Sequence, residues 1–291
     1  MALGDIAKDE KDLEFLKKCK NTYFCLSEVI YINGRIYGKL CKNRFCTTCN
    51  GIRKANLINQ YYPILKNWLD PQFLTLTTKS VTADELENLI IEQKAFFIRI
   101  IDKYEKRYKT GKTPKIICLR THESNFNPLK NWYNPHFHII TPDLKTARLL
   151  KKEWLKAFGD KRTKPYAQKI IKIKDMEHHL IETIKYGTKV FTDPDAKKGI
   201  RGKNYKLYAR AYYTIIKAFE GKKIIANFGF KLPKGTRKKE KTETTYSSAS
   251  TLHYLPKVND WINKETGSML TRFSPDEELK TLIAEVDKEL M

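Results

Sequence analysis

The chain has 291 residues, enough for one large domain or two small ones with a hydrophobic core. Its 56 Lys and Arg outnumber 33 Asp and Glu, and the formal net charge of +23 predicts a polyanionic partner. The 16 Tyr and 14 Phe offer stacking surfaces, so we favour a nucleic acid over a merely solubilising charge. The sequence shows neither a long apolar run nor an apolar leader, so we expect a cytoplasmic protein without a membrane span.

The first part of the chain, residues 1–62, combines a charged start with a cluster of cysteines. Residues 1–18 are expected to form a frayed helix or an arm. Five cysteines follow, at Cys19, Cys25, Cys41, Cys46 and Cys49. The last three have the spacing C-x4-C-x2-C, and either of the first two can complete a tetrahedral four-cysteine zinc site. Unliganded core thiols are the alternative, but this Lys-rich segment offers little core, and disulfides are rare in the cytosol.

The next part, residues 63–234, alternates between strand and helix patterns. Thr alternates with apolar residues over 73–80, which predicts a strand, and an apolar stripe predicts a helix over 83–108. The other predicted strands cover 115–124 (with Cys118 as a core residue), 134–142, 167–174 and 222–232, and the other helices cover 143–158, 175–191 and 206–219. The order strand, helix, strand, strand, helix, strand predicts a ferredoxin-like α+β sheet with helices over one face. Residues 235–291 are expected to form a basic linker and a helix at 275–290.

Two histidines in the segment NPHFHIITP indicate a metal site. His136 and His138 are two residues apart in a predicted strand, so their side chains point to the same face. Glu123, on the preceding antiparallel strand, can add a carboxylate across the hairpin. Two imidazoles and one carboxylate suit Mg²⁺, Mn²⁺ or a borderline transition metal. A surface strand with two half-exposed histidines is the alternative.

The predicted helix at 175–191 carries a second group of reactive residues. Glu182 and Tyr186 lie one turn apart, and Lys189 continues the same face. A phenol can act as a nucleophile toward phosphorus when a metal or a cation assists it. Glu182 can serve as a general base and Lys189 can neutralise the phosphate. An amphipathic helix with a solvated lysine is the alternative for this segment taken alone.

Four segments, in this order, resemble the motifs of rolling-circle plasmid replication initiators. The zinc-binding segment of that family resembles CKNRFCTTCNGIRKA, and its first motif resembles FLTLTTKS. Its histidine-hydrophobic-histidine motif resembles NPHFHIITP, and its catalytic-tyrosine motif resembles IKYGTK. These are Rep proteins of the HUH endonuclease superfamily, and the resemblance is to the single-tyrosine branch of small Gram-positive plasmids. It covers residues 19–232.

The resemblance implies an activity as well as a fold. It implies a ferredoxin/RRM-like HUH nuclease fold with a central antiparallel sheet and a small N-terminal zinc-binding segment. Tyr186 would attack a phosphodiester at the double-strand origin, stay joined to the 5′ phosphate and free a 3′ hydroxyl to start rolling-circle replication. Glu182 would allow termination with water, and Lys189 corresponds to the lysine of the tyrosine motif.

The resemblance also implies ligands and partners. His136, His138 and Glu123 would hold the catalytic Mg²⁺ or Mn²⁺. Cys19 would be the fourth zinc ligand, with Cys25 as the alternative. The substrate would be single-stranded or supercoiled plasmid origin DNA, and a host helicase and polymerase would act with the protein.

Two other functions remain compatible with the sequence. A transposase or relaxase of the same superfamily would use the same chemistry, but it would leave the cysteine segment unexplained. A non-catalytic zinc protein that binds nucleic acid would account for the charge and the cysteines, but it would give the histidine pair and the tyrosine helix no role.

Overall fold

The computed structural model describes residues 2–32, 35–184, 205–233, 250–256, 260–263 and 265–270. Tyr186 and Lys189 lie outside the described residues, as does the helix expected at 275–290. The chain divides into two compact units. One comprises Met1–Cys19 and Asn43–Thr236, and the other comprises Lys20–Lys42 and Arg237–Met291. The units are therefore interleaved along the chain, whereas the sequence suggested three consecutive parts.

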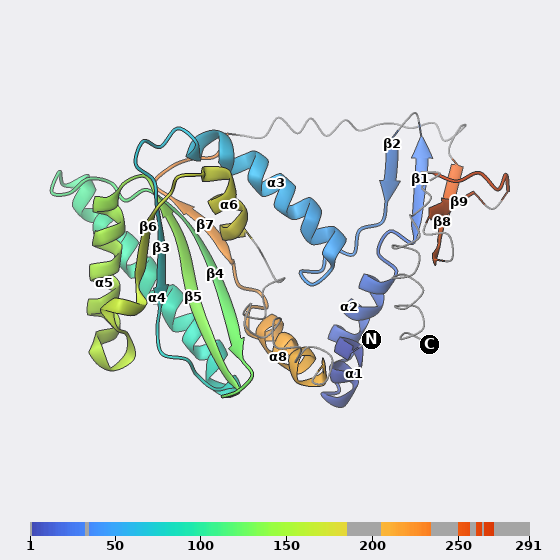
Figure 1. Cartoon of the computed structure of the whole chain (residues 1–291), viewed down its shortest axis with the longest axis horizontal. Helices are drawn as coiled ribbons and strands as arrows, with labels where there is room; N and C mark the ends of the chain where they lie inside the picture. The colour runs from blue at the N-terminus through green and yellow to red at the C-terminus, as the bar shows by residue number, and fades with distance from the viewer. Residues whose placement is uncertain are drawn as a thin grey trace. The chain divides into compact units, whose positions relative to one another are not determined.

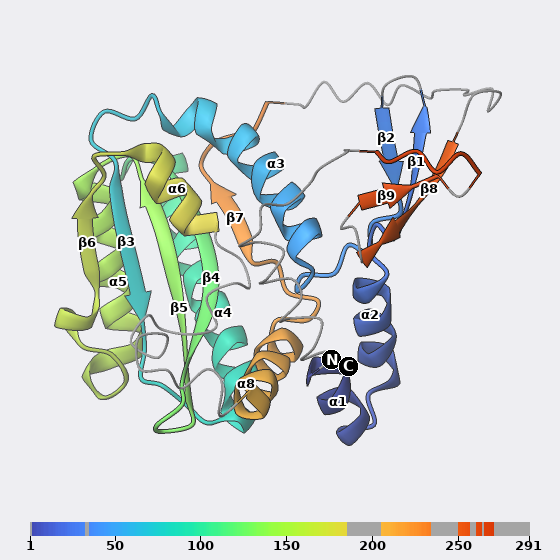
Figure 2. The same cartoon turned by 45° about the vertical axis from the view of Figure 1, so that its right-hand side comes forward.

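A five-stranded antiparallel sheet forms the centre of the first unit, with the strand order β6-β3-β5-β4-β7 (Figure 2). Its strands are β3 (Gln72–Thr77), β4 (Cys118–Asn127), β5 (Trp132–Thr141), β6 (Lys169–Lys172) and β7 (Ile225–Phe228). The strands β4 and β5 form a long hairpin. The order β3-α4-β4-β5-α5-β6, with α4 (Ala83–Lys109) and α5 (Leu144–Arg162), confirms the predicted succession of elements.

The helices α4 and α5 cover one face of this sheet. The helix α4 begins with a capping box formed by Thr82 and Glu85, a pattern that is typical of helix N-termini. The apolar stripes of both helices pack on the even-numbered side chains of β3 and the odd-numbered side chains of β5. The fully buried members of this core include Leu74, Leu76, Phe97, Cys118, Phe137, Ile139, Leu150 and Trp154. The burial of Cys118 confirms that it is a core residue.

The opposite face of the sheet is also covered, which the sequence analysis did not anticipate. The helices α3 (Thr47–Leu65) and α6 (Met176–Ile184) lie there (Figure 1). Leu65 and Leu180 pack on this face against Leu119 and Ile140. The sequence interpretation missed α3 because the helix begins inside the cysteine segment, where its N-cap is Cys46.

The N-terminus forms two helices rather than an arm, α1 (Ala2–Asp9) and α2 (Leu13–Tyr23). Ile6 and Phe15 are buried, and the ring of Phe15 meets that of Tyr213 edge-on at 5.0 Å. Tyr213 belongs to α8 (Tyr205–Ala218), which also packs against α4 beside the sheet. Ion pairs also join this region to α8, between Arg210 and Glu10 and between Lys217 and Asp12.

The second unit contains a four-stranded antiparallel sheet with the order β2-β1-β8-β9. Its strands are β1 (Glu28–Ile32), β2 (Arg35–Gly38), β8 (Ser250–Leu255) and β9 (Asp260–Ile262). Val29 and Leu252 pair across β1 and β8 and are buried. The sequence interpretation assigned only a linker and a helix to residues 235–291, because strands this short pair with a segment more than two hundred residues away. Among the described residues, no helix has the length and apolar character needed to cross a membrane.

Candidate active site

The two predicted metal-binding histidines and Glu123 come together on the face of the sheet that carries α3 and α6. In the β4–β5 register, Glu123 lies opposite His136, and both residues point to the same side as His138. The Nε2 atoms of the two histidines are 3.1 Å apart, and Nε2 of His138 is 3.8 Å from Oε2 of Glu123. One ligand atom from each residue lies within 4.8 Å of the others, so the three can hold one metal ion.

The other ring nitrogen of each histidine is engaged by the surrounding strands. Nδ1 of His136 is 2.9 Å from the backbone oxygen of Asn134, and a carbonyl only accepts, so this Nδ1 carries the proton. Nδ1 of His138 is 3.3 Å from Oγ1 of Thr75. With its Nδ1 protonated, Nε2 of His136 carries the lone pair. The Thr75 hydroxyl can accept from Nδ1 of His138, which is compatible with the same tautomer there. Metal-binding histidines in proteins are commonly fixed in this way.

Burial favours the neutral form of His136. Desolvation lowers the pKa of this imidazole, and the hydrogen bond to Asn134 opposes the shift only in part. A metal ligand must be a neutral imidazole, so this environment suits coordination. The ring of Phe73 stacks on that of His138 at 5.1 Å and restricts its orientation.

A cavity of about 570 Å³ opens in front of these three residues. Glu182 lines the cavity from α6, opposite the strand that carries the histidines. The structure therefore brings the predicted carboxylate of the tyrosine motif to the same cavity as the predicted metal ligands. Tyr186 and Lys189, the other two predicted catalytic residues, lie outside the described residues.

The cavity also contains residues that the sequence interpretation did not select. His178 and His179 line it from α6, and Thr75 lines it from β3. The sequence carried a signal for the two histidines, since they precede Glu182 by four and three residues and so share its helix face. Thr75 had no such signal, because its pairing with His138 depends on the β3–β5 register.

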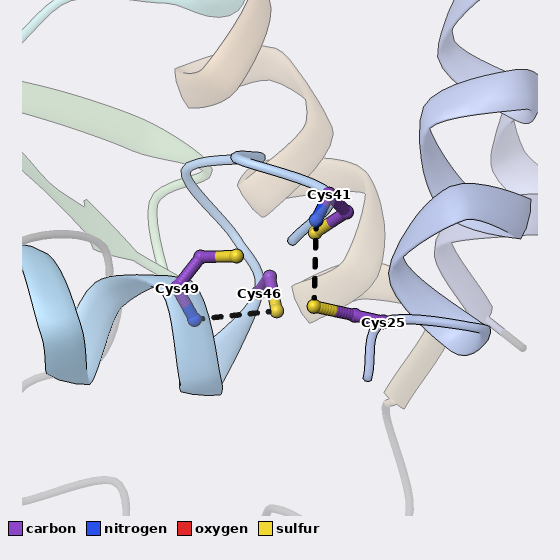
Figure 3. Close-up of side chains that lie close together, drawn as sticks. All are labelled: Cys25, Cys41, Cys46 and Cys49. Carbon is purple, nitrogen blue, oxygen red and sulfur yellow. Dashed lines mark hydrogen bonds between the residues drawn. The ribbon is translucent and has the colours of Figure 1, made fainter. Parts of the chain in front are cut away.

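Four cysteines form a second group of potential metal ligands (Figure 3). The sulfurs of Cys25, Cys41, Cys46 and Cys49 lie within 4.8 Å of one another. The backbone N–H of Cys41 donates to the sulfur of Cys25, and that of Cys49 donates to the sulfur of Cys46, each at 3.5 Å. All six cysteines lie within the described residues, and none forms a disulfide.

The structure places Cys25 in this group, whereas the sequence favoured Cys19 and kept Cys25 as the alternative. Cys19 lies in α2, and burial raises the pKa of its thiol. The family resemblance favoured Cys19 because of its longer gap before Cys41, although a zinc site tolerates either gap. Four cysteine sulfurs are the donor set of a structural zinc ion.

Two curated proteins are similar to this chain. It is 29% identical over 164 residues to "Protein rep" of Staphylococcus aureus, a match that covers 52% of this chain and 69% of the relative. It is 26% identical over 143 residues to "Protein rep" of a Bacillus species, and this match covers 44% of each protein. The chain thus spans less than half the length of the second relative. No family model matches the chain. No solved structure matches it either.

Proposed function

We propose that the protein initiates plasmid replication by nicking one strand of the origin DNA, and that it belongs to the single-tyrosine HUH endonucleases. The similarity to two proteins named rep supports the first part. The observation that carries the second part is the shared cavity. Glu123, His136, His138 and Glu182 line it together, although Glu182 is separated from the others in sequence by a strand and a helix. The strand order β6-β3-β5-β4, which is that of a ferredoxin-like sheet, supports the fold assignment.

Two imidazoles and one carboxylate fit a divalent ion such as Mg²⁺ or Mn²⁺ and leave positions open for oxygen ligands. Such an ion, when bound, polarises a phosphodiester. His136 and His138 would bind it through Nε2, and Glu123 would bind it through a carboxylate oxygen. The hydrogen bond to Asn134 keeps the lone pair of His136 on Nε2, and the Thr75 hydroxyl can hold His138 in the same tautomer by accepting from its Nδ1.

Tyr186 is the proposed nucleophile. Its phenol oxygen would form a bond to phosphorus, and the bond from phosphorus to the 3′ oxygen would break, leaving a 5′ phosphotyrosine and a 3′ hydroxyl. Lys189 would neutralise charge on the phosphate. The freed 3′ hydroxyl is a primer end, so a host polymerase and a helicase would have to follow.

Glu182 has a separate proposed role in termination. A water molecule would attack the phosphotyrosine, Glu182 would accept its proton, and the phenol oxygen of Tyr186 would leave. The placement of Glu182 on the cavity wall supports this role. A positioned general base contributes roughly 10²- to 10⁴-fold. Glu182→Ala should therefore slow release by a factor in that range and leave first-strand nicking largely intact.

A nicking assay tests the proposed function. The protein is incubated with Mn²⁺ and single-stranded oligonucleotides that tile the origin region of the DNA encoding it, and covalent adducts are separated on a denaturing gel. We expect the wild type to form an adduct and Tyr186→Phe to form none while still binding DNA. Tyr166→Phe is the matched control, because Tyr166 is 83% exposed and precedes the cavity-lining Ala167. An adduct in the Tyr186→Phe variant would place the nucleophile elsewhere.

A non-catalytic zinc protein would give a different result. It would bind the same oligonucleotides, but no adduct would form with or without Mn²⁺. Chelation also distinguishes the proposed catalytic ion from the proposed structural zinc. EDTA should stop cleavage quickly without unfolding the protein, because a hard ion with open positions exchanges readily.

A further inference from the structure

The face of the β4–β5 hairpin that carries the metal ligands continues beyond them toward the hairpin turn. Side chains two residues apart share a face, so Trp132 and Asn134 lie on the same side as His136. On the paired strand, Asn127 lies opposite Trp132, and Asn125 lies opposite Asn134. Asn125 and Asn134 line the cavity. The cavity floor is therefore continuous with the end of the hairpin.

Trp132 stands at that end with an exposed ring. Its side chain is 43% exposed, whereas Trp154 on the other side of the sheet is fully buried. The ammonium of Lys130 lies 5.4 Å from the Trp132 ring centroid. Leu129, beside it in the turn, is 84% exposed. An exposed aromatic ring beside a cation is suited to stacking on a base while the cation meets a phosphate.

The turn is held in one conformation by its own hydrogen bonds. Oδ1 of Asn127 accepts from the backbone N–H groups of Leu129 and Lys130, at 3.0 and 3.2 Å. Asn131 has a φ of 52°, a left-handed conformation that Asn adopts more readily than most residues. A preorganised turn presents Trp132 at a fixed place, which lowers the entropic cost of binding.

We infer that Trp132 is a stacking subsite for one unpaired base of the DNA strand, outside the cleavage centre. This inference rests on the proposed function, which brings a single strand to the same sheet face. Trp132 and His136 are four positions apart in β5, which corresponds to about 13 Å at roughly 3.3 Å per residue. The stacked base therefore lies a short distance along the strand from the nicked phosphate. Lys130 would contact the phosphate chain there, and the cavity-lining Lys169, which pairs with Thr75 on β3, would contact it near the centre.

Equilibrium binding tests the subsite without any chemistry. The affinity of the full-length protein for a fluorescein-labelled oligothymidylate is measured by anisotropy, without added divalent ion. One stacked base is worth about 1–3 kcal/mol, so Trp132→Ala should weaken binding about 5- to 150-fold, and Trp132→Phe should retain most of the affinity. Tyr108→Ala is the matched control. Tyr108 is 45% exposed and lies near Lys115 in the same way, with the ammonium 5.7 Å from its ring, but it belongs to α4.

A strand without bases distinguishes stacking from a general loss of structure. On an abasic oligonucleotide of equal length, Trp132→Ala should bind like the wild type, while Lys130→Ala should be weaker on both strands. Equal affinity of Trp132→Ala and wild type for oligothymidylate would overturn the inference, as would equal losses on both strands. If the wild type failed to bind oligothymidylate at all, the proposed function itself would be overturned.

Discussion

At the scale of single residues, the hydrogen bonds behind the histidines matter as much as the histidines themselves. The backbone oxygen of Asn134 fixes the tautomer of His136, and the hydroxyl of Thr75 contacts Nδ1 of His138. Groups of this kind usually contribute 10- to 100-fold to metal affinity. A two-histidine motif is visible in a sequence. The hydrogen-bond partners of its rings are not, because they come from other parts of the fold.

Replacing Thr75 with valine should weaken metal binding. The substitution keeps the shape but removes the hydroxyl that meets Nδ1 of His138. We expect Mn²⁺ affinity, measured by calorimetry, to fall about tenfold or more. Thr121→Val is the control, because its hydroxyl bonds only the backbone oxygen of His138. Equal losses in the two variants would show that the effect is not specific to the imidazole.

The cysteine group leads to a second prediction at this scale. The purified protein should contain about one zinc ion, as four sulfur ligands imply. Cys25→Ser should lose that zinc, because Cys25 is part of the group, whereas Cys19→Ser should retain it. Metal analysis of the two variants decides between the candidate ligands. Zinc loss in Cys19→Ser alone would show that Cys19, and not Cys25, is the fourth zinc ligand.

At the scale of elements, hydrogen bonds and ion pairs of charged residues link the N-terminal helices to α8 and the residues that follow it. Asp12 accepts from the backbone N–H of Phe15, and Lys217 lies 3.0 Å from its carboxylate. Lys217 also pairs with Glu220 at 2.9 Å, and Lys18 donates to the same carboxylate. These contacts lower the pKa of Asp12, mainly through the Phe15 N–H, and the pKa of Glu220, mainly through Lys18.

The lowered carboxylate pKa values predict acid sensitivity of the folded protein. Asp12 and Glu220 have ordinary values of 3.8 and 4.5, so their stabilising contribution is present above that range. It is lost as the pH falls through their lower folded-state values. The melting temperature should therefore drop below about pH 4.5. Asp12→Asn should show a shallower drop, and an unchanged acid profile in that variant would argue against this network.

At the scale of the whole molecule, the net charge of +23 should dominate DNA affinity. Binding that releases counterions weakens as salt rises, with a logarithmic slope of about −0.7 per phosphate contacted on a single strand. About six contacts would weaken binding roughly 100- to 1000-fold between 50 and 200 mM salt. Anisotropy titrations over that range measure the slope. A slope near zero would mean that the positive charge contributes little to DNA affinity.

Most of the central unit was predictable, because its local patterns agree with its tertiary arrangement. The Thr and apolar alternation of β3, the capped stripe of α4 and the paired histidines of β5 each follow from period and spacing. The β4–β5 hairpin then fixes Glu123 opposite His136. The ligands of the candidate centre were therefore accessible from the sequence, as was the helix that carries Glu182.

The tertiary structure decided what depends on contacts between distant segments. The pairing of Thr75 with His138 follows from the β3–β5 register, and the placement of α3 follows from apolar residues on the second face of the sheet. The pairing of β1 with β8 joins segments with no local signal for each other. Sequence periodicity records which side of an element is apolar, because burial acts on each residue. It does not record which remote element covers that side, because many apolar faces fit equally well until the whole chain is packed.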